Sequence, residues 1–69
     1  MKIPGCRYER ERRGLSAAAL AQRSGVAENT IRSAESGADV REKTAAKIAR
    51  ALEEVPPLAV MSALRGESR

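Results

Sequence analysis

The chain has no histidine, phenylalanine or tryptophan, and Tyr8 is its only aromatic residue. Histidine is the side chain most often used as a general base and is a common zinc ligand, and Cys6, the only cysteine, has no base beside it in the sequence. A cluster of carboxylates and a glycine-rich phosphate-binding loop are also missing. These absences argue against an enzyme, a metal site or a bound cofactor.

A second group of absences concerns location. One cysteine cannot form an internal disulfide, and the sequence shows no secretory signal. The longest apolar run, Val55 to Leu64, is too short to span a bilayer and is interrupted by Ser62. We therefore expect a reduced, cytoplasmic protein that does not enter a membrane.

What the sequence does contain favours short helices. Its 69 residues fit one domain, and alanine-rich stretches at 16–22 and 44–52 favour helix because alanine loses no side-chain entropy there. The β-branched and aromatic residues that strands prefer are few. We predict an all-α fold, a compact bundle of about five short helices, in a single domain over residues 1–69 with a flexible arm at 1–5 and a flexible tail at 66–69.

Cap and turn residues mark the ends of these helices. Ser16 is a good N-cap, Pro57 fits the first position of a helix, and the glycines at 14, 25 and 37 suit the turns that end one. The predicted helices span residues 6–13, 17–24, 27–36, 41–54 and 57–65. The side chains expected to face inward are Cys6 and Tyr8 in the first helix and Ala45, Ile48, Ala49 and Leu52 in the fourth.

The charge is positive and unevenly distributed. The chain carries a formal charge of +4, and residues 1–37 hold seven basic and four acidic residues, a balance of +3. This balance permits binding to a polyanion, but it also suits a small helical domain that is basic for solubility alone.

Two neighbouring helices, at 17–24 and 27–36, have the spacing of a tightly crossed pair. Leu20 and Ile31 are placed to meet across the pair, and Ala21 is small enough to allow a close crossing. Gly25 can adopt the positive φ of a tight turn, beneath which Val26 packs. On these positions alone the pair also fits an ordinary helical hairpin of any all-α domain.

A longer pattern makes the pair more specific. It reads Leu15-Ser16-x-x-x-Leu20-Ala21-x-x-x-Gly25-Val26-x-x-x-Thr30-Ile31-x-x-x-Glu35-x-Gly37, and it is followed by Thr44-x-x-Lys47-Ile48-Ala49-x-Ala51-Leu52. With Arg10 on the first helix, this resembles the Cro and phage-repressor (XRE-like) helix-turn-helix family over residues 6–55. The resemblance implies a lambda-repressor-like DNA-binding domain with its helix-turn-helix at residues 17–36.

The resemblance also assigns roles to residues. It implies a partly buried ion pair between Arg10 and Glu35, and base-reading side chains on the outer face of the helix at 27–36. The same outer face also fits a merely solvated helix surface. The candidate base readers are Glu28, Asn29, Arg32, Ser33 and Ala27. The candidate phosphate contacts are the backbone of Ala17 and Ala18, with Thr30, Arg41 and Lys43, and Arg7 and Arg23 are further candidates.

Three positions depart from the family pattern. The family often has glutamine at Ala17, a hydroxyl residue at Ala27 and an apolar residue at Glu9. Glu28 in addition brings negative charge toward the phosphates of DNA, although it also suits a helix N-terminus. These departures leave the fold intact and put the affinity for DNA in doubt.

The sequence therefore predicts a small transcriptional regulator, a repressor, that binds double-stranded DNA at a pseudo-palindromic operator as a homodimer. The fifth helix, with Leu58, Val60, Met61 and Leu64, is expected either to form the dimer interface or to complete the monomer core. One alternative is a protein-interaction module, such as an antitoxin or anti-repressor, that keeps this fold with weak or no DNA binding. Another is an adaptor domain whose basic charge is incidental.

Overall fold

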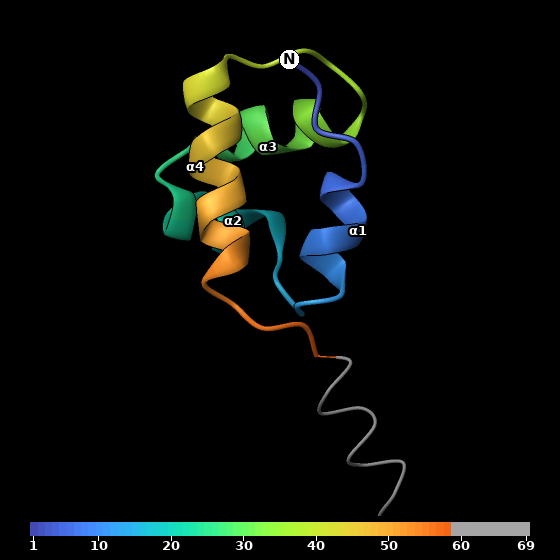
Figure 1. The fold of residues 1–69 in the computed structure, drawn as a ribbon, viewed down its shortest axis with the longest axis vertical. Coiled ribbons are helices and arrows are strands. Elements are labelled where there is room, and N and C mark those ends of the chain that lie inside the picture. Colours follow the sequence, from blue (N-terminus) through green and yellow to red (C-terminus); the bar gives the residue numbers. More distant parts are fainter. Residues whose placement is uncertain (59–69) are drawn as a thin grey trace, which may run out of the picture.

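The structure is a computed structural model that describes residues 1–58 of the chain. Within these residues the fold is entirely helical, with α1 (Cys6–Glu11), α2 (Ala17–Ser24), α3 (Glu28–Glu35) and α4 (Glu42–Glu53) (Figure 1). The all-α class is confirmed, with four helices here where about five were expected. Pro57 and Leu58 are not helical, and the rest of the expected fifth helix and the tail at 66–69 lie outside the described residues.

Local hydrogen bonds explain where the helices start and stop. The Ser16 Oγ accepts from the backbone N–H of Ala19 at 3.0 Å, so α2 begins where the N-cap prediction placed it. Gly25 ends α2 with φ 73°, a left-handed conformation that few residues other than glycine adopt. The first helix ends at Glu11, two residues before the predicted end, because the N–H groups of Arg13 and Gly14 bond three residues back and tighten the chain into a turn.

The core lies where α2, α3 and α4 meet. Leu20, Ile31 and Ile48, one from each of these helices, are fully buried. Smaller side chains, including Val26 in the turn between α2 and α3, surround them. Because no aromatic ring contributes to this core, the helices must approach closely, and α2 packs against both α3 and α4.

Two expectations about buried residues were wrong. Tyr8 is 64% exposed, because the inner side of α1 is occupied by Cys6 and by arginine side chains, and the Tyr8 ring lies under the Arg12 guanidinium at 5.4 Å instead. On α4, Ala49 is exposed and Ala51 is buried. Ala51 lies three residues after Ile48 and so shares its inward face, whereas Ala49 borders an open hollow beside the N-terminal arm.

The N-terminal arm runs along the loop between α3 and α4 (Figure 1). The Met1 ammonium donates to the Val40 carbonyl at 2.7 Å, and the Val40 N–H donates back to the Met1 carbonyl at 2.7 Å. Ile3 is half-buried against the core. The flexibility of the arm stays a prediction. None of the helices in residues 1–58 has the length and apolar character that crossing a membrane requires.

Candidate nucleic-acid interface

The inner face of α3 is fixed in the core, which determines what its outer face presents. Ile31 is fully buried and Ala34 is 2% exposed. Asn29 and Ser33, on the opposite side of the helix, are exposed, and neither side chain makes a hydrogen bond within residues 1–58. This face therefore offers hydrogen-bonding groups to a partner while the helix itself is held rigidly.

The other three candidate readers differ from one another. Ala27 is exposed at the N-cap of α3, where it supplies no side-chain cap. Glu28 and Arg32 are bound to each other, since the Arg32 Nη2 and Nε donate to the Glu28 Oε2 at 2.6 and 3.1 Å. Their spacing of four residues is the signal in the sequence that predicts such a pair. The guanidinium of Arg32 is therefore occupied by a carboxylate of its own helix.

An open hollow separates α3 from the start of α4. It has a volume of about 400 Å³, and Asn29, Thr30 and Ser33 line one side of it. The opposite side comes from the loop and the start of α4, with Arg41 at the N-cap position and Thr44 in the first turn. The structure thus brings the candidate base readers of α3 and the candidate phosphate contacts Thr30 and Arg41 to the same side of the domain.

The N-termini of α2 and α4 supply backbone N–H donors that have no hydrogen-bond partner within residues 1–58. The N–H groups of Ala17 and Ala18 make no hydrogen bond within residues 1–58, and Arg41 gives α4 no side-chain cap. Helix N-termini carry partial positive charge and favour anions such as phosphate. Ala17 as a whole is 6% exposed and packs into the core, so its side chain is not available to a ligand, whereas Ala18 is exposed.

Arg10 and Glu35 form the ion pair that the family resemblance implies. The Arg10 Nη2 donates to the Glu35 Oε1 at 3.0 Å, the Nε donates to the other carboxylate oxygen, and the two side chains are only 13% and 10% exposed. The bond to Glu35 raises the pKa of Arg10 above its ordinary value. The Arg10 Nη1 also donates to the Leu15 carbonyl at 2.8 Å, so one side chain links α1, α3 and the segment before α2.

A second arginine with a structural role was missed by the sequence reasoning. The Arg13 Nε donates to the carbonyls of Leu52 and Val55 at 2.7 and 2.8 Å, and its Nη1 donates to the Glu9 carboxylate at 2.6 Å. Arg13 therefore holds the end of α4 against α1, and its bond is the main reason that the pKa of Glu9 lies below its usual range. The spacing of four residues between Glu9 and Arg13 is a signal that could have predicted their ion pair, but it does not predict the bonds of Arg13 to α4.

The other candidate phosphate contacts and the first residue of the expected dimer interface lie outside the hollow. Lys43 is exposed in the first turn of α4, and Arg23 is exposed near the end of α2. Arg7 is bound to the Glu11 carboxylate at 2.9 Å. Leu58 is 40% exposed, and its N–H donates to the Arg12 carbonyl at 2.7 Å. The other residues of the expected dimer interface, Val60, Met61 and Leu64, lie outside the described residues.

Within residues 1–58, four short helices surround a small aliphatic core, and a tight glycine turn precedes an outward polar helix. This arrangement defines the class of helix-turn-helix domains. The helix-turn-helix profile, of the Cro/C1 type, matches residues 7–59, and the chain belongs to this family. The predicted resemblance is therefore confirmed, and the match supports a DNA-binding regulator. No curated protein and no solved structure matches the chain significantly.

Proposed function

We propose that this domain binds double-stranded DNA in a sequence-specific manner and acts as a small transcriptional repressor, with α3 lying in the major groove. The observation that carries the proposal is the outer face of α3, where Asn29 and Ser33 are exposed without internal partners while Ile31 is fully buried beneath them. A rigid helix with unpaired polar groups suits direct readout of base edges.

Each candidate reader has a base that its chemistry fits. Asn29 pairs with adenine through two hydrogen bonds, and Arg32, once released from Glu28, pairs with guanine in the same way. Glu28 accepts from the amino group of cytosine, Ser33 bonds to either kind of base, and the Ala27 methyl contacts a thymine methyl. Each good contact contributes about 1–3 kcal/mol of discrimination against the wrong base.

Phosphate contacts position the helix without reading sequence. We assign them to the backbone N–H groups of Ala17 and Ala18, to Thr30 beside the hollow, and to the cations Arg41 and Lys43. These groups come from the start of α2, from α3 and from the start of α4. Contacts from three elements fix the orientation of α3 in the groove.

One short recognition helix rarely gives enough affinity, so we propose a symmetric homodimer that reads two half-sites of a pseudo-palindromic operator about 34 Å apart. Leu58 is exposed here and, with Val60, Met61 and Leu64, forms the proposed interface. Gel filtration of the wild type beside Leu64→Asp tests it. We expect a dimer that the variant converts to a monomer, and a wild type that is monomeric at high concentration refutes it.

The decisive experiment for DNA binding is selection of bound fragments from random duplex DNA with the purified protein. We expect a preferred sequence to emerge. Asn29→Ala should then relax the preference at one position of the site, at a cost of about 1–3 kcal/mol on the preferred sequence. Lys43→Ala should weaken binding to every sequence alike and lower the dependence of affinity on salt.

Equal losses on all sequences for Asn29→Ala would contradict its role as a reader. Gln22→Ala is a suitable control, because Gln22 is exposed on α2 and the proposal gives it no contact with DNA. If the wild type selects no sequence and does not bind duplex DNA at low salt, the proposed function is wrong.

The Glu28–Arg32 pair favours a second candidate. Because this pair neutralises the one arginine on the outer face of α3, it leaves that face less attractive to DNA than the sequence suggests. The alternative is therefore a protein-interaction module, such as an antitoxin or anti-repressor, that uses α3 to bind a protein. Loss of a protein complex in Asn29→Ala, without any binding to duplex DNA, would establish this alternative.

A further inference from the structure

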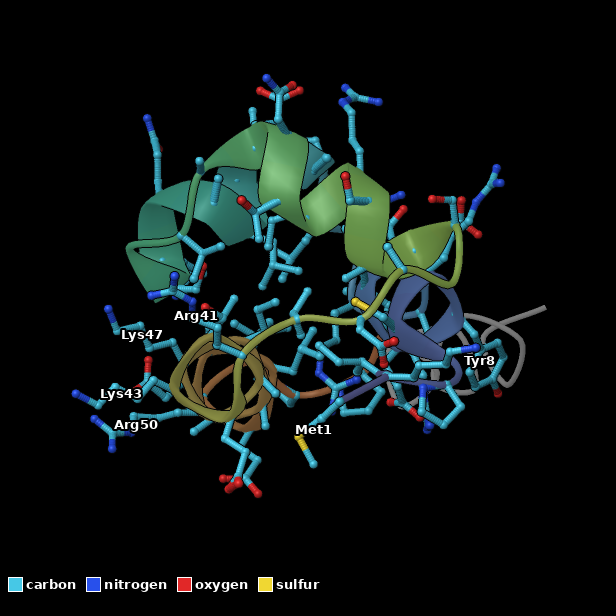
Figure 2. All side chains as sticks on the ribbon, turned by 90° about the horizontal axis from the view of Figure 1, so that it is seen from above. Met1, Tyr8, Arg41, Lys43, Lys47 and Arg50 are labelled. Carbon is cyan, nitrogen blue, oxygen red and sulfur yellow. The ribbon has the colours of Figure 1, made fainter. Side chains whose placement is uncertain are left out.

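One edge of α4 carries a line of cations beyond the proposed phosphate contacts. Lys43, Lys47 and Arg50, called here the α4 basic row, are spaced by four and three residues and so lie along one stripe of the helix. All three are exposed. Figure 2 shows them projecting, together with Arg41, from one side of α4, away from α1 and Tyr8.

The charges of the row are not neutralised by the fold. Within residues 1–58 no ion pair includes any of its three members, although seven ion pairs form elsewhere in this part of the chain. Glu42 and Glu53, the acidic residues within α4, lie on another edge of the helix. Glu54, at the C-cap, follows Arg50 by four residues on the same stripe, but it makes no ion pair with the row. Because Ile48 and its neighbours already anchor α4 in the core, the fold itself does not need the row.

The row begins at the candidate interface and leads away from it. Arg41 and Thr44 line the hollow beside α3, and Lys43 stands between them in the sequence. Seven residues of α-helix separate Lys43 from Arg50, a rise of about 10 Å. One strand of B-DNA presents a phosphate about every 3.4 Å along the helix axis, so a stretch of this length would face about three phosphates where α4 lies along the strand.

We propose that the α4 basic row binds the phosphate backbone of duplex DNA beside the stretch that α3 reads, through Lys47 and Arg50 in addition to Lys43. The inference rests on the proposed function and extends it, because it assigns a sequence-independent surface to a part of α4 outside the helix-turn-helix. The only apolar residues exposed on α4 are the alanines at 46 and 49, so no large apolar side chain lies beside the row on this helix. Protein interfaces are depleted in lysine and enriched in aromatic residues, and membrane-surface helices need apolar anchors, so DNA is the partner that fits this surface best.

The test removes two charges that the proposed function does not use. Binding of Lys47→Gln/Arg50→Gln to a short mixed-sequence duplex is measured over a range of salt concentrations. Each phosphate contact contributes about 0.9 to the slope of log affinity against log salt, so we expect the slope to fall by about 1.8. The preferred sequence should not change, and the urea midpoint of unfolding should match that of the wild type.

Lys2→Gln/Arg12→Gln is the matched control, since it removes the same net charge from the arm and from the turn after α1. Lys47→Arg keeps the charge and should keep the slope. If both double variants lower the slope equally, the effect is one of net charge and the inference is overturned. An unchanged slope for Lys47→Gln/Arg50→Gln, while Asn29→Ala still alters sequence preference, overturns the inference and leaves the proposed function standing. A wild type that binds no duplex overturns both.

Discussion

Helices α1 and α4 are both rich in cations, and they use them in opposite ways. Every arginine of α1 and of the turn after it is bound to a carboxylate: Arg7 to Glu11, Arg10 to Glu35, and Arg12 and Arg13 to Glu9. On α4 the members of the basic row have no acidic partner within the described residues. In the first set, Arg10 and Arg13 hold separate helices together, and Arg7 and Arg12 pair locally. The second set remains available to a partner.

This difference teaches that formal charge does not locate a binding surface. The sequence places an excess of +3 in residues 1–37, which suggests that polyanion binding resides there. In the structure most of those arginines are already neutralised by neighbouring carboxylates. Residues 38–58 hold four basic and four acidic residues and have no net charge, yet none of their four cations takes part in an ion pair within the described residues. Those cations lie at the start and along one edge of α4.

The largest expected effect comes from breaking the most buried pair of α1. Arg10→Ala leaves the Glu35 carboxylate almost fully covered and without its partner, and we expect the free energy of unfolding to fall by about 3 kcal/mol. Urea denaturation measures this loss. Arg7→Ala, which breaks an exposed pair on the same helix, is the control and should change stability by less than about 1 kcal/mol.

A double variant separates the buried charge from the loss of packing. Arg10→Met/Glu35→Leu removes both charges and should recover a large part of the stability, because buried ion pairs are often replaceable by apolar side chains. If Arg10→Ala is no more destabilising than Arg7→Ala, the Arg10–Glu35 pair does not stabilise the fold. The contrast between the bound cations of α1 and the available cations of α4 would then be wrong.

Arg13 gives the next effect in size. Arg13→Met removes the donors to the carbonyls of Leu52 and Val55, and we expect unfolding to become easier by about 2 kcal/mol. Hydrogen exchange should speed up in the last turn of α4 more than in α2. Arg50→Met is the matched control, because it changes an exposed arginine of α4 that holds nothing in place, and it should leave both measurements unchanged. Similar losses for the two variants would remove the distinction between bound and available arginines.

The sequence predicted the bounds of the helices far better than it predicted which partners the charged side chains bind. Helix bounds depend on local signals such as Ser16 and Gly25, and these placed α2 at the residues observed. The pair between Arg10 and Glu35 was available only through the family resemblance, since twenty-five positions separate the two residues. The contacts of Arg13 with carbonyls at the end of α4 depend on how two helices pack, which no local pattern encodes.

Helical periodicity predicted the burial of some side chains correctly but not of all. Ile31 lies inward as expected, and Ala34, three residues later, shares its face. On α4, Ala51 follows Ile48 by three residues and lies on its inward face, whereas Ala49 was expected inward and is exposed beside the hollow at the N-terminal arm. The spacing of four residues between Glu28 and Arg32 predicts an ion pair, but the family resemblance assigns each of the two side chains only a separate role as a base reader.

On α3, one substitution can turn an arginine that is paired with a carboxylate into one that is available to a partner. Glu28→Gln releases Arg32 from its carboxylate and removes a negative charge from the candidate interface. If α3 binds in the major groove, affinity for duplex DNA should rise several-fold, equivalent to about 1 kcal/mol, as the released arginine becomes able to bond to a base or a phosphate. Binding titrations at one fixed salt concentration measure the change.

Glu53→Gln is the control for that substitution, since it removes one negative charge from the far end of α4. An equal gain in both variants would mean that net charge alone is responsible. Weaker binding by Glu28→Gln would mean that the proposed contact of Glu28 with cytosine contributes more to affinity than the release of Arg32, and the predicted gain would be wrong.

The smallest expected effect concerns acid. Arg13 lowers the pKa of Glu9, and Arg7 lowers that of Glu11, in each case mainly through a hydrogen bond to the carboxylate. A carboxylate whose pKa is lowered by folding stabilises the native state above its unfolded pKa, and this contribution is lost as the pH falls through the folded value. We therefore expect the wild type to lose stability below the ordinary pKa of glutamate. Glu9→Gln/Glu11→Gln should be slightly less stable at neutral pH and should vary less with pH in the acid range. Urea midpoints measured from neutral pH downward test this, and parallel curves for the two proteins would show that the pairs of α1 are too exposed to contribute.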